Sequence, residues 1–339
     1  MNRLYIKIQI LGLQFTLRRS RASRTEGRLT EMLNSTQSFI FTKPMYQNPL
    51  QIPLQKVIFP DSEISNVSVL RLDAIDRYLG GNKYFKLLFI IDEIKKENHQ
   101  TIITFGGAYS NHLAAFASLR ELFPTKNFIA IIRGDESMVE KSLTLARLRS
   151  LNIDIQFWHA GLYRELCNNF KHDYFNQFSN ALILPEGGSN QLAVQGCQSI
   201  TDYIPATFNQ IVLPIATGAT MSGIIRGQQS HQTVHGIAVL KGKDFLQKNI
   251  EMFLSSGEKR TTSNYTIHDG YHHGGYAKTT TSLLQFVSQF NEVNDFEIEP
   301  IYSGKLFYAL FKMLSNGLFS PADNILAIHT GGLQYLPAH

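Results

Sequence analysis

From about residue 100 onwards, short apolar runs rich in β-branched residues alternate with segments of helical periodicity. Such runs predict buried strands, and residues 139–151, where apolar positions recur at roughly helical spacing, are typical of the segments between them. The predicted strands are residues 101–105, 128–132, 153–158, 181–184, 210–215, 234–239, 265–268 and 325–329. Alternation that persists this long predicts an α/β protein with two open, mostly parallel twisted sheets and helices on both faces.

Two of the predicted helices begin behind residues that favour N-cap positions. The helix after residue 105 begins behind Ser110 and Asn111, and the helix after residue 184 begins near Ser189 and Asn190. In folds of this class, ligands bind beyond the carboxyl ends of the strands. We therefore expect functional residues in the loops that follow the strands.

Residues 1–44 lack this alternation. Residues 1–31 hold seven Lys and Arg residues against two Glu, a balance equal to the formal net charge of +5 for the whole chain. The Arg-rich, Ser-containing composition is that of a transit-like segment. The alternatives are a poorly ordered tail, or an extension upstream of a working start at Met32 or Met45. Because chain termini tend to disorder, we predict a poorly ordered leader over residues 1–44.

The rest of the chain is electrically neutral, and its composition excludes several classes of protein. A basic surface would have to lie in the leader, which has no interleaved aromatic residues, so no nucleic-acid partner is predicted. The longest stretch without charge, between Asp202 and Arg226, contains prolines and amides and predicts no membrane-spanning helix. Two cysteines cannot build a disulfide framework, so the sequence favours a cytoplasmic protein.

Five turns carry glycine, the ordinary residue of tight strand-to-helix turns. They are residues 80–83 (Gly-Gly-Asn-Lys), 106–112 (Gly-Gly-Ala-Tyr-Ser-Asn-His), 187–190 (Gly-Gly-Ser-Asn), 217–220 (Thr-Gly-Ala-Thr) and 330–332 (Thr-Gly-Gly). Each alone indicates only a turn, but five in series on one α/β chain favour a binding site.

The turn at residues 217–220 lies between a predicted strand and a helical pattern over residues 221–226. Backbone N–H groups and hydroxyls at a helix N-terminus bind anions. The turn lacks the lysine of a Walker loop, and the chain lacks a G-x-G-x-x-G fingerprint followed by an acid. The pattern therefore predicts a phosphorylated cofactor that is neither a nucleotide nor a dinucleotide.

Lys83 adds reactivity to this picture. A lysine in a desolvated pocket loses its proton more readily and can attack a carbonyl carbon as a free amine. Most lysines are solvated surface residues, so Lys83 is a candidate because of the motifs that accompany it.

Those motifs occur in one order. They are Gly-Gly-Asn-Lys at 80–83, Ser-Asn-His at 110–112, Pro-Glu-Gly-Gly-Ser-Asn at 185–190, Thr-Gly-Ala-Thr at 217–220, Tyr-Ser-Gly-Lys at 302–305 and His-Thr-Gly-Gly at 329–332. From about Asn48 to Tyr335, the chain resembles the 1-aminocyclopropane-1-carboxylate (ACC) deaminase / D-cysteine desulfhydrase family of tryptophan-synthase-β-like, fold type II pyridoxal-phosphate enzymes. The resemblance implies pyridoxal 5'-phosphate in a cleft between two domains, a small amino acid as substrate, and a homodimer.

The resemblance also implies roles for matching residues. Lys83 is similar to the family's Schiff-base lysine, Asn111 to the asparagine beside the cofactor ring hydroxyl, and Ser110 to a serine that contacts substrate and helps to move protons. The implied catalytic residues are Lys83, Ser110, Tyr276 and Tyr302; the implied cofactor-binding residues are Lys83, Asn111, Thr217, Gly218, Ala219, Thr220, Ser303 and Thr330.

Ser303 distinguishes activities within the family. In the cyclopropane deaminases this position is an acid that partners the pyridine nitrogen, whereas a hydroxyl, here assisted by Thr330, makes the cofactor a weaker electron sink. Ring opening depends on a strong sink more than β-elimination does. Tyr109, in place of the deaminases' usual glutamine, points the same way. Glu297 and Glu299 lie nearby in the sequence, but the sequence does not show where they lie relative to the cofactor ring.

The sequence therefore predicts a lyase or deaminase that releases ammonia and a 2-oxo acid by β-elimination, as D-cysteine desulfhydrase does. Two alternatives stay open: an ACC deaminase that forms 2-oxobutyrate and ammonia, and a cofactor- or amino-acid-binding relative without catalysis. The predicted large, cofactor-binding domain combines residues 45–88 with 200–339, and the predicted small domain is residues 89–199.

Three histidines do not form a recognisable metal motif. His112, His272 and His273 do not match zinc-binding spacing, even with an aspartate nearby, so no metal is predicted. We expect these histidines to be loop residues near the mouth of the pocket. Cys197 lies in a helical pattern and is expected to pack in the interior.

Overall fold

The structure is a computed structural model that describes residues 7–10, 13–16, 50–76, 78–96, 99–255 and 264–333. The chain forms two compact units, Met1–Pro49 and Leu50–His339. In the first unit, strands β1 (Lys7–Ile10) and β2 (Leu13–Thr16) pair antiparallel. The sequence does not predict this pair. The other residues of the predicted leader lie outside the described residues.

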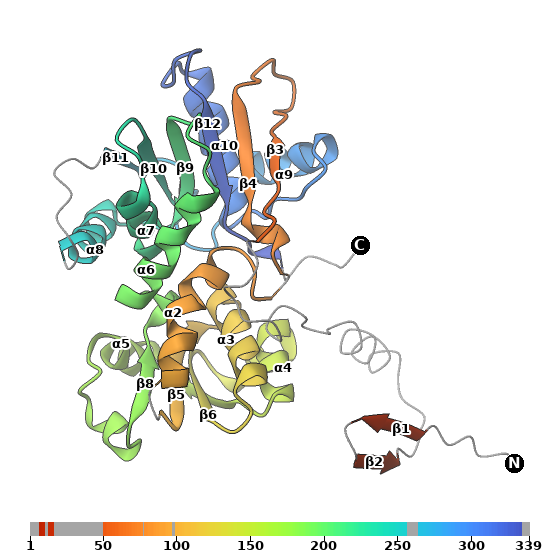
Figure 1. Cartoon of the computed structure of the whole chain (residues 1–339), viewed down its shortest axis with the longest axis vertical. Coiled ribbons are helices and arrows are strands. Elements are labelled where there is room, and N and C mark those ends of the chain that lie inside the picture. The colour runs from red at the N-terminus through yellow and green to blue at the C-terminus, as the bar shows by residue number, and fades with distance from the viewer. Residues whose placement is uncertain are drawn as a thin grey trace, which may run out of the picture. The chain divides into compact units, whose positions relative to one another are not determined.

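The second unit contains two sheets (Figure 1). The six-stranded sheet has the order β11 (Tyr265–His268), β10 (Thr233–Ala238), β9 (Gln210–Ile215), β12 (Ile325–His329), β4 (Val67–Arg71) and β3 (Leu54–Lys56). The four-stranded sheet has the order β7 (Asp154–Trp158), β6 (Asn127–Arg133), β5 (Thr101–Gly107) and β8 (Ala181–Leu184). Every pairing in these two sheets is parallel except the one between β3 and β4.

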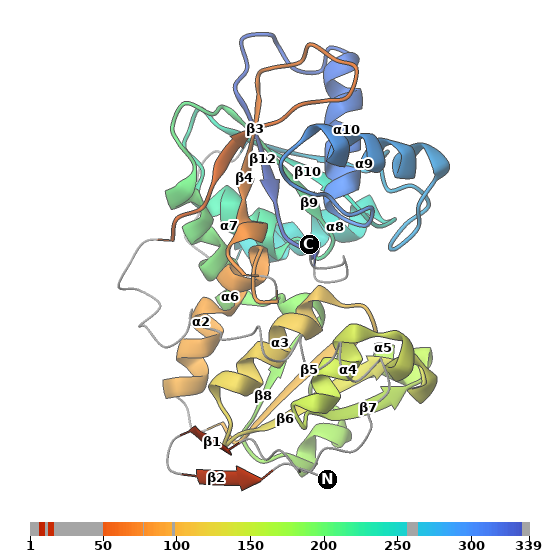
Figure 2. The same ribbon diagram turned by 90° about the vertical axis from the view of Figure 1, so that its right-hand side faces the viewer.

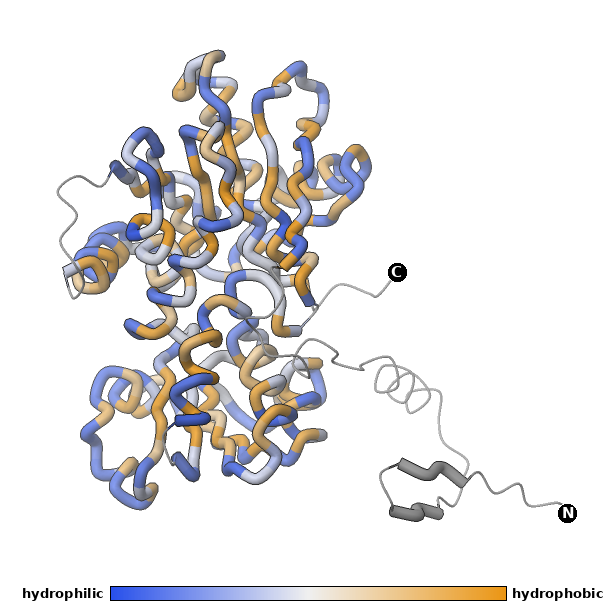
Figure 3. The backbone as a smooth tube through the Cα atoms, viewed as in Figure 1, coloured by the Kyte–Doolittle hydropathy of each residue, from blue (hydrophilic) through white to orange (hydrophobic). Residues whose placement is uncertain are grey.

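Helices cover both faces of the larger sheet. The helices are α2 (Asn82–Lys96), α3 (Asn111–Leu122), α4 (Leu143–Ser150), α5 (Ala160–Asn168), α6 (Gln191–Gln198), α7 (Ala219–Gly227), α8 (Lys243–Ser255), α9 (Thr281–Val293) and α10 (Ser303–Ser315). Figure 2 shows α9 and α10 on one side of the six-stranded sheet and α6 and α7 on the other. Apolar residues of α9 and α10 form one core with residues of the sheet, among them Phe290, Phe307 and Val212. In Figure 3, hydrophobic residues follow the strands of both sheets.

This architecture confirms the predicted fold class. All eight predicted strands are present, four of them with the predicted bounds. The predicted helix over residues 139–151 is wrong in one respect, because it is divided into a 3-10 helix (Glu136–Lys141) and α4. Ser142 lies at the division, where its hydroxyl donates to the Ala108 carbonyl and accepts from the Leu145 N–H. A tertiary hydrogen bond thus interrupts a periodicity that looks continuous in the sequence.

A glycine in α6 allows this helix to pack closely against α2, the helix that carries Lys83. A Cβ atom on Gly196 of α6 would lie 1.9 Å from the carbonyl oxygen of Phe85 in α2, so only glycine permits this approach. The predicted boundary between residues 88 and 89 falls inside α2, which is therefore continuous across it. Residues 50–339 form a single compact unit. The predicted division of these residues into a large and a small domain stays a prediction.

Candidate active site

Lys83 lies in the first turn of α2, and backbone contacts fix where this helix begins. The Gly81 N–H donates to the Leu72 carbonyl at 2.8 Å, and the Asn82 N–H donates to the Thr330 carbonyl at 3.1 Å. Gly81 has a φ of +67°, a conformation that side chains disfavour. The start of α2 is thereby joined to the loop that follows β12.

The amine of Lys83 is held in a form suited to nucleophilic attack. Its side chain is half-buried, and its Nζ donates to Asn82 Oδ1 at 3.2 Å. Burial, with a contribution from the charge of Lys86, lowers the pKa of Lys83 well below its ordinary value. A lysine with a lowered pKa carries a free amine at neutral pH more often than a surface lysine does.

The turn after β9 forms a cradle at the N-terminus of α7 with the groups that an anion-binding site requires. Gly218 is the N-cap, with a φ of +91°, and the first N–H groups of a helix have no acceptor within it. Thr217 Oγ1 lies 2.6 Å from Ser189 Oγ, and Asn82 Nδ2 donates to Thr220 Oγ1 at 2.8 Å. Hydroxyls, free N–H groups and the positive end of the helix dipole therefore converge here.

Lys86 is a functional candidate that the sequence analysis missed. It is 2% exposed and lies one turn after Lys83 on the same face of α2. Its Nζ donates to the Gly187 carbonyl and to Ser189 Oγ, both at 2.9 Å, which brings its charge to the cradle. Burial lowers the pKa of Lys86 to about 8. The spacing of three residues behind Lys83 was the signal that could have identified it.

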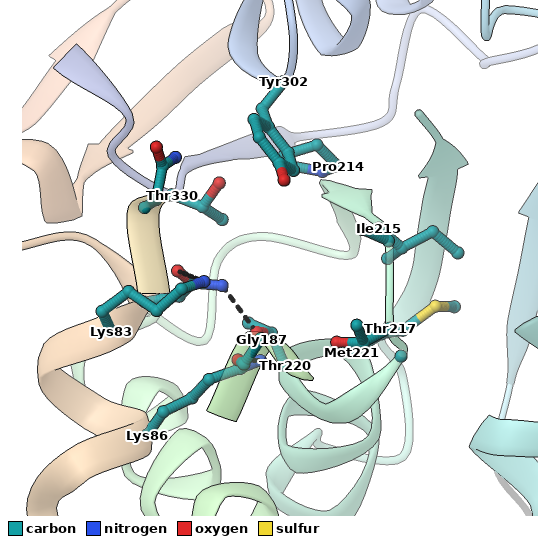
Figure 4. Close-up of a pocket in the computed structure, with 14 residues that line it drawn as sticks. Lys83, Lys86, Gly187, Pro214, Ile215, Thr217, Thr220, Met221, Tyr302 and Thr330 are labelled. Carbon is teal, nitrogen blue, oxygen red and sulfur yellow. Dashed lines mark hydrogen bonds between the residues drawn. The ribbon is translucent and has the colours of Figure 1, made fainter. Parts of the chain in front are cut away.

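These groups surround a cavity of about 510 Å³, a volume that includes its opening to solvent. Figure 4 shows Lys83 and Lys86 reaching it from α2 and Tyr302 from the start of α10. The wall includes residues that follow β8, β9 and β12 in their loops, and Asn111 at the start of the helix after β5, as the rule for carboxyl strand ends requires. Among the residues proposed from the sequence, the wall contains Lys83, Asn111, Thr217, Gly218, Thr220, Tyr302 and Thr330.

Four other predicted residues lie beside the cavity wall and not in it. Ser110 is the N-cap of α3, as predicted, but its side chain makes no capping hydrogen bond. Ala219 is buried in the first turn of α7. Tyr276 is 43% exposed, with its ring centre 6.1 Å from that of Tyr302. Ser303 is fully buried in the first turn of α10.

Glu299 explains the surroundings of Ser303. The buried carboxylate of Glu299 accepts N–H groups of Ile301, Tyr302 and Ser303 at 2.6–2.9 Å, so it caps the start of α10. Ser303 Oγ accepts the Glu299 N–H at 2.9 Å and lies 3.3 Å from Glu299 Oε1. Burial raises the pKa of Glu299, and the N–H donors oppose this rise. Both residues are thus engaged with each other and with the helix start.

His329 stabilises the loop that follows β12. This side chain is fully buried, and its Nδ1 accepts the Gly331 N–H at 3.2 Å while its Nε2 donates to the Glu297 carbonyl at 2.9 Å. Burial lowers the pKa of His329, and the nearby Asp73 opposes this effect. The neutral ring, with its proton on Nε2, is the form that can accept the Gly331 N–H at Nδ1.

The prediction that His112 is a loop residue at the mouth of the pocket is wrong. It is 1% exposed in α3, and its Nε2 lies 2.7 Å from Thr104 Oγ1. Cys197 is buried in α6, as expected.

No group of three or more potential metal ligands occurs in the described ranges. Within the same ranges, no helix has the length and apolar character needed to cross a membrane.

Comparisons with known proteins support the resemblance found in the sequence. No family model matches the chain. The mitochondrial bifunctional D-cysteine desulfhydrase/ACC deaminase of Arabidopsis thaliana is 26% identical over 288 residues, which cover 78% of this chain and 72% of the relative. The crystal structure of an ACC deaminase homologue matches with a TM-score of 0.71 and 22% identity, covering 84% of this chain and 90% of that one. A hydrogen sulfide-producing enzyme from Fusobacterium nucleatum shares the fold at a TM-score of 0.56, with 11% identity and coverage of 84% and 97%.

Proposed function

From its resemblance to ACC deaminases and D-cysteine desulfhydrases, we propose that this protein is a pyridoxal-phosphate-dependent lyase. It releases ammonia and a 2-oxo acid from a small amino acid, with D-cysteine as the favoured substrate. One observation carries the proposal: the half-buried Lys83 amine and the cradle at the start of α7 lie on the same cavity. A homodimer in the cytoplasm is part of the proposal.

The residues of the cavity fit this cofactor. The cradle at Thr217–Thr220 and the ammonium of Lys86 would hold a phosphate, and Asn111 would bind the ring hydroxyl. When bound, the cofactor supplies an aldehyde that combines with amines and a ring that withdraws electrons from the substrate Cα. Ser303 and Thr330 remain the proposed neighbours of the ring nitrogen.

The chain's own groups would then position the substrate and move its proton. Lys83 Nζ lies at the cavity wall, and its lowered pKa would let it act as the base that takes the proton from the substrate Cα. Tyr302 lines the cavity at the start of α10, where its ring would help to keep water from the reacting atoms. Ser110 and Tyr276 are proposed to assist in proton transfer from the edge of the site.

The surroundings of Ser303 favour elimination over ring opening. An acid near the ring nitrogen would strengthen the electron sink. Glu299 is the acid that forms a hydrogen bond with the Ser303 hydroxyl. Its carboxylate already accepts three backbone N–H groups at the start of α10. The weaker sink that remains suits a substrate with an α-hydrogen and a good leaving group. ACC deamination is the second candidate, favoured by the names of the relatives.

Release of pyruvate from D-cysteine tests the proposal. Purified, cofactor-loaded protein is expected to form pyruvate and sulfide from D-cysteine, with L-cysteine measured alongside. Formation of 2-oxobutyrate from ACC without pyruvate from either cysteine would transfer the proposal to ACC deamination. A visible cofactor band with no product from any of these amino acids would contradict a catalytic function.

Affinity for a phosphorylated ligand is expected to fall as the pH rises from 7 to 9. Lys86 is charged below its pKa of about 8 and loses its attraction for phosphate above it. A bound phosphate stabilises the charged amine, so the dissociation constant should rise up to about tenfold per pH unit above 8. Calorimetric titration with pyridoxamine 5'-phosphate measures this, because that ligand forms no covalent bond with Lys83. In Lys86→Gln, binding should be weaker at pH 7 and should fall less between pH 7 and 9; an unchanged pH dependence would contradict the assignment.

A further inference from the structure

Two charged residues at the carboxyl ends of the four-stranded sheet take no part in the proposed cofactor site. Arg133 is the last residue of β6 and lies opposite Gly107 of β5. Glu186 follows the end of β8. Both side chains are exposed. They lie at the edge of the sheet from which Asn111 and Gly187 reach the cavity.

Tyr163 connects these two charges. Its hydroxyl donates to Glu186 Oε1 at 3.0 Å, and the guanidinium carbon of Arg133 lies 5.9 Å from the centre of its ring. Arg133 and Glu186 do not pair with each other, and neither belongs to a salt bridge within the described part of the chain. Two opposite charges therefore contact the same tyrosine without forming an ion pair with each other.

Tyr276 lies beside the cavity and within electrostatic reach of both charges. Its ring meets the ring of Tyr302, which lines the cavity, and nearly half of its surface is exposed. Burial is the main cause that raises the pKa of Tyr276; the charge of Glu186 adds to this rise and that of Arg133 opposes it. Both charges thus act on a tyrosine one ring away from the cavity. We call Arg133, Tyr163, Glu186 and Tyr276 the rim.

We propose that the rim binds the far end of the substrate's β-substituent and favours substituents that end in a zwitterionic amino-acid group, as in a thioether of two amino acids. The proposal rests on the proposed lyase function. A guanidinium binds a carboxylate through parallel hydrogen bonds, and a carboxylate binds an ammonium. A ligand with both groups matches both charges of the rim, whereas a ligand with one group leaves the other charge unmatched.

The reaction with such a thioether is balanced by water alone. The Cα–H and Cβ–S bonds break, and the electron pair of the Cβ–S bond leaves with the sulfur. The sulfur takes up a proton and departs as a free amino-acid thiol. The three-carbon remainder adds one water and loses ammonia, which yields pyruvate. No oxidant or reductant is consumed.

Four racemic or meso thioethers of cysteine separate the two charges of the rim. They are S-ethylcysteine, S-(2-carboxyethyl)cysteine, S-(2-aminoethyl)cysteine and meso-lanthionine. Each charged group that meets its partner is expected to raise kcat/KM about two- to fivefold, so meso-lanthionine should be the best of the four. Arg133→Gln should remove the advantage given by the carboxylate, and Glu186→Gln the advantage given by the ammonium.

Ratios of kcat/KM between substrates make this test independent of enzyme stability. Arg149→Gln and Glu140→Gln change exposed charges on the same part of the chain and should preserve the wild-type ratios. If Arg133 only stacks on Tyr163 and Glu186 only holds its hydroxyl, all four substrates will respond equally to the variants, and the proposal is overturned while the lyase function stands. No pyruvate from any thioether or from D-cysteine would overturn both.

Discussion

Lys83→Ala is expected to lower kcat/KM by about 10⁴-fold or more and to abolish the visible absorbance of the bound cofactor. No other amine can replace it at the cavity wall, because the Nζ of Lys86 is engaged with the Gly187 carbonyl and Ser189 Oγ. The loss therefore combines a missing attachment point with a missing base. Measurement of pyruvate release and of the absorbance spectrum after incubation with pyridoxal phosphate checks both.

The matched control is Lys95→Ala, which removes an exposed lysine from the last turn of the same helix. This variant should keep wild-type turnover and absorbance. Binding of pyridoxamine 5'-phosphate by Lys83→Ala separates loss of chemistry from loss of the fold, since the cradle at the start of α7 does not include Lys83. Persistent turnover in Lys83→Ala would remove the basis of the proposed function.

The strands of the fold could be predicted where apolar runs are fully buried. In β12 all five residues are buried, and its run stands out in the sequence. By contrast, β3 has only three residues, is mostly exposed and pairs antiparallel at the edge of the sheet. Such a strand has neither alternation nor an apolar run. Its neighbour β4 is buried but precedes the regular strand–helix pattern, which begins at about residue 100.

The position of the site was predictable, and the state of its side chains was not. Glycine turns after parallel strands must meet at one edge of each sheet, and the cavity lies there. Lys86 was missed because its partners, Gly187 and Ser189, lie about a hundred residues away in the sequence. The cap formed by Glu299 likewise decides what Ser303 can contact, and residue types alone do not reveal it.

Gly81→Ala is expected to destabilise the protein by about 3 kcal/mol and to lower its melting temperature by about 5 °C. A Cβ atom at this position would lie 2.0 Å from the Thr330 carbonyl oxygen, and the φ of +67° adds strain. The backbone must move where α2 meets the loop after β12, so Lys83 and Thr330 separate. Because small displacements of reacting groups are costly, kcat/KM should fall about 10²-fold. Thermal unfolding and pyruvate release measure the two effects.

Gly107→Ala shows whether this close approach is the cause. Gly107 belongs to another of the glycine turns that look alike in the sequence, yet a Cβ atom on it would meet nothing within 4 Å. Its replacement should change the free energy of unfolding by only about 0.5 kcal/mol. Equal destabilisation by the two substitutions would mean that contact between Gly81 and Thr330 does not fix the start of α2. A large difference would show that one glycine, two residues before the reactive lysine, holds the two sides of the cavity together.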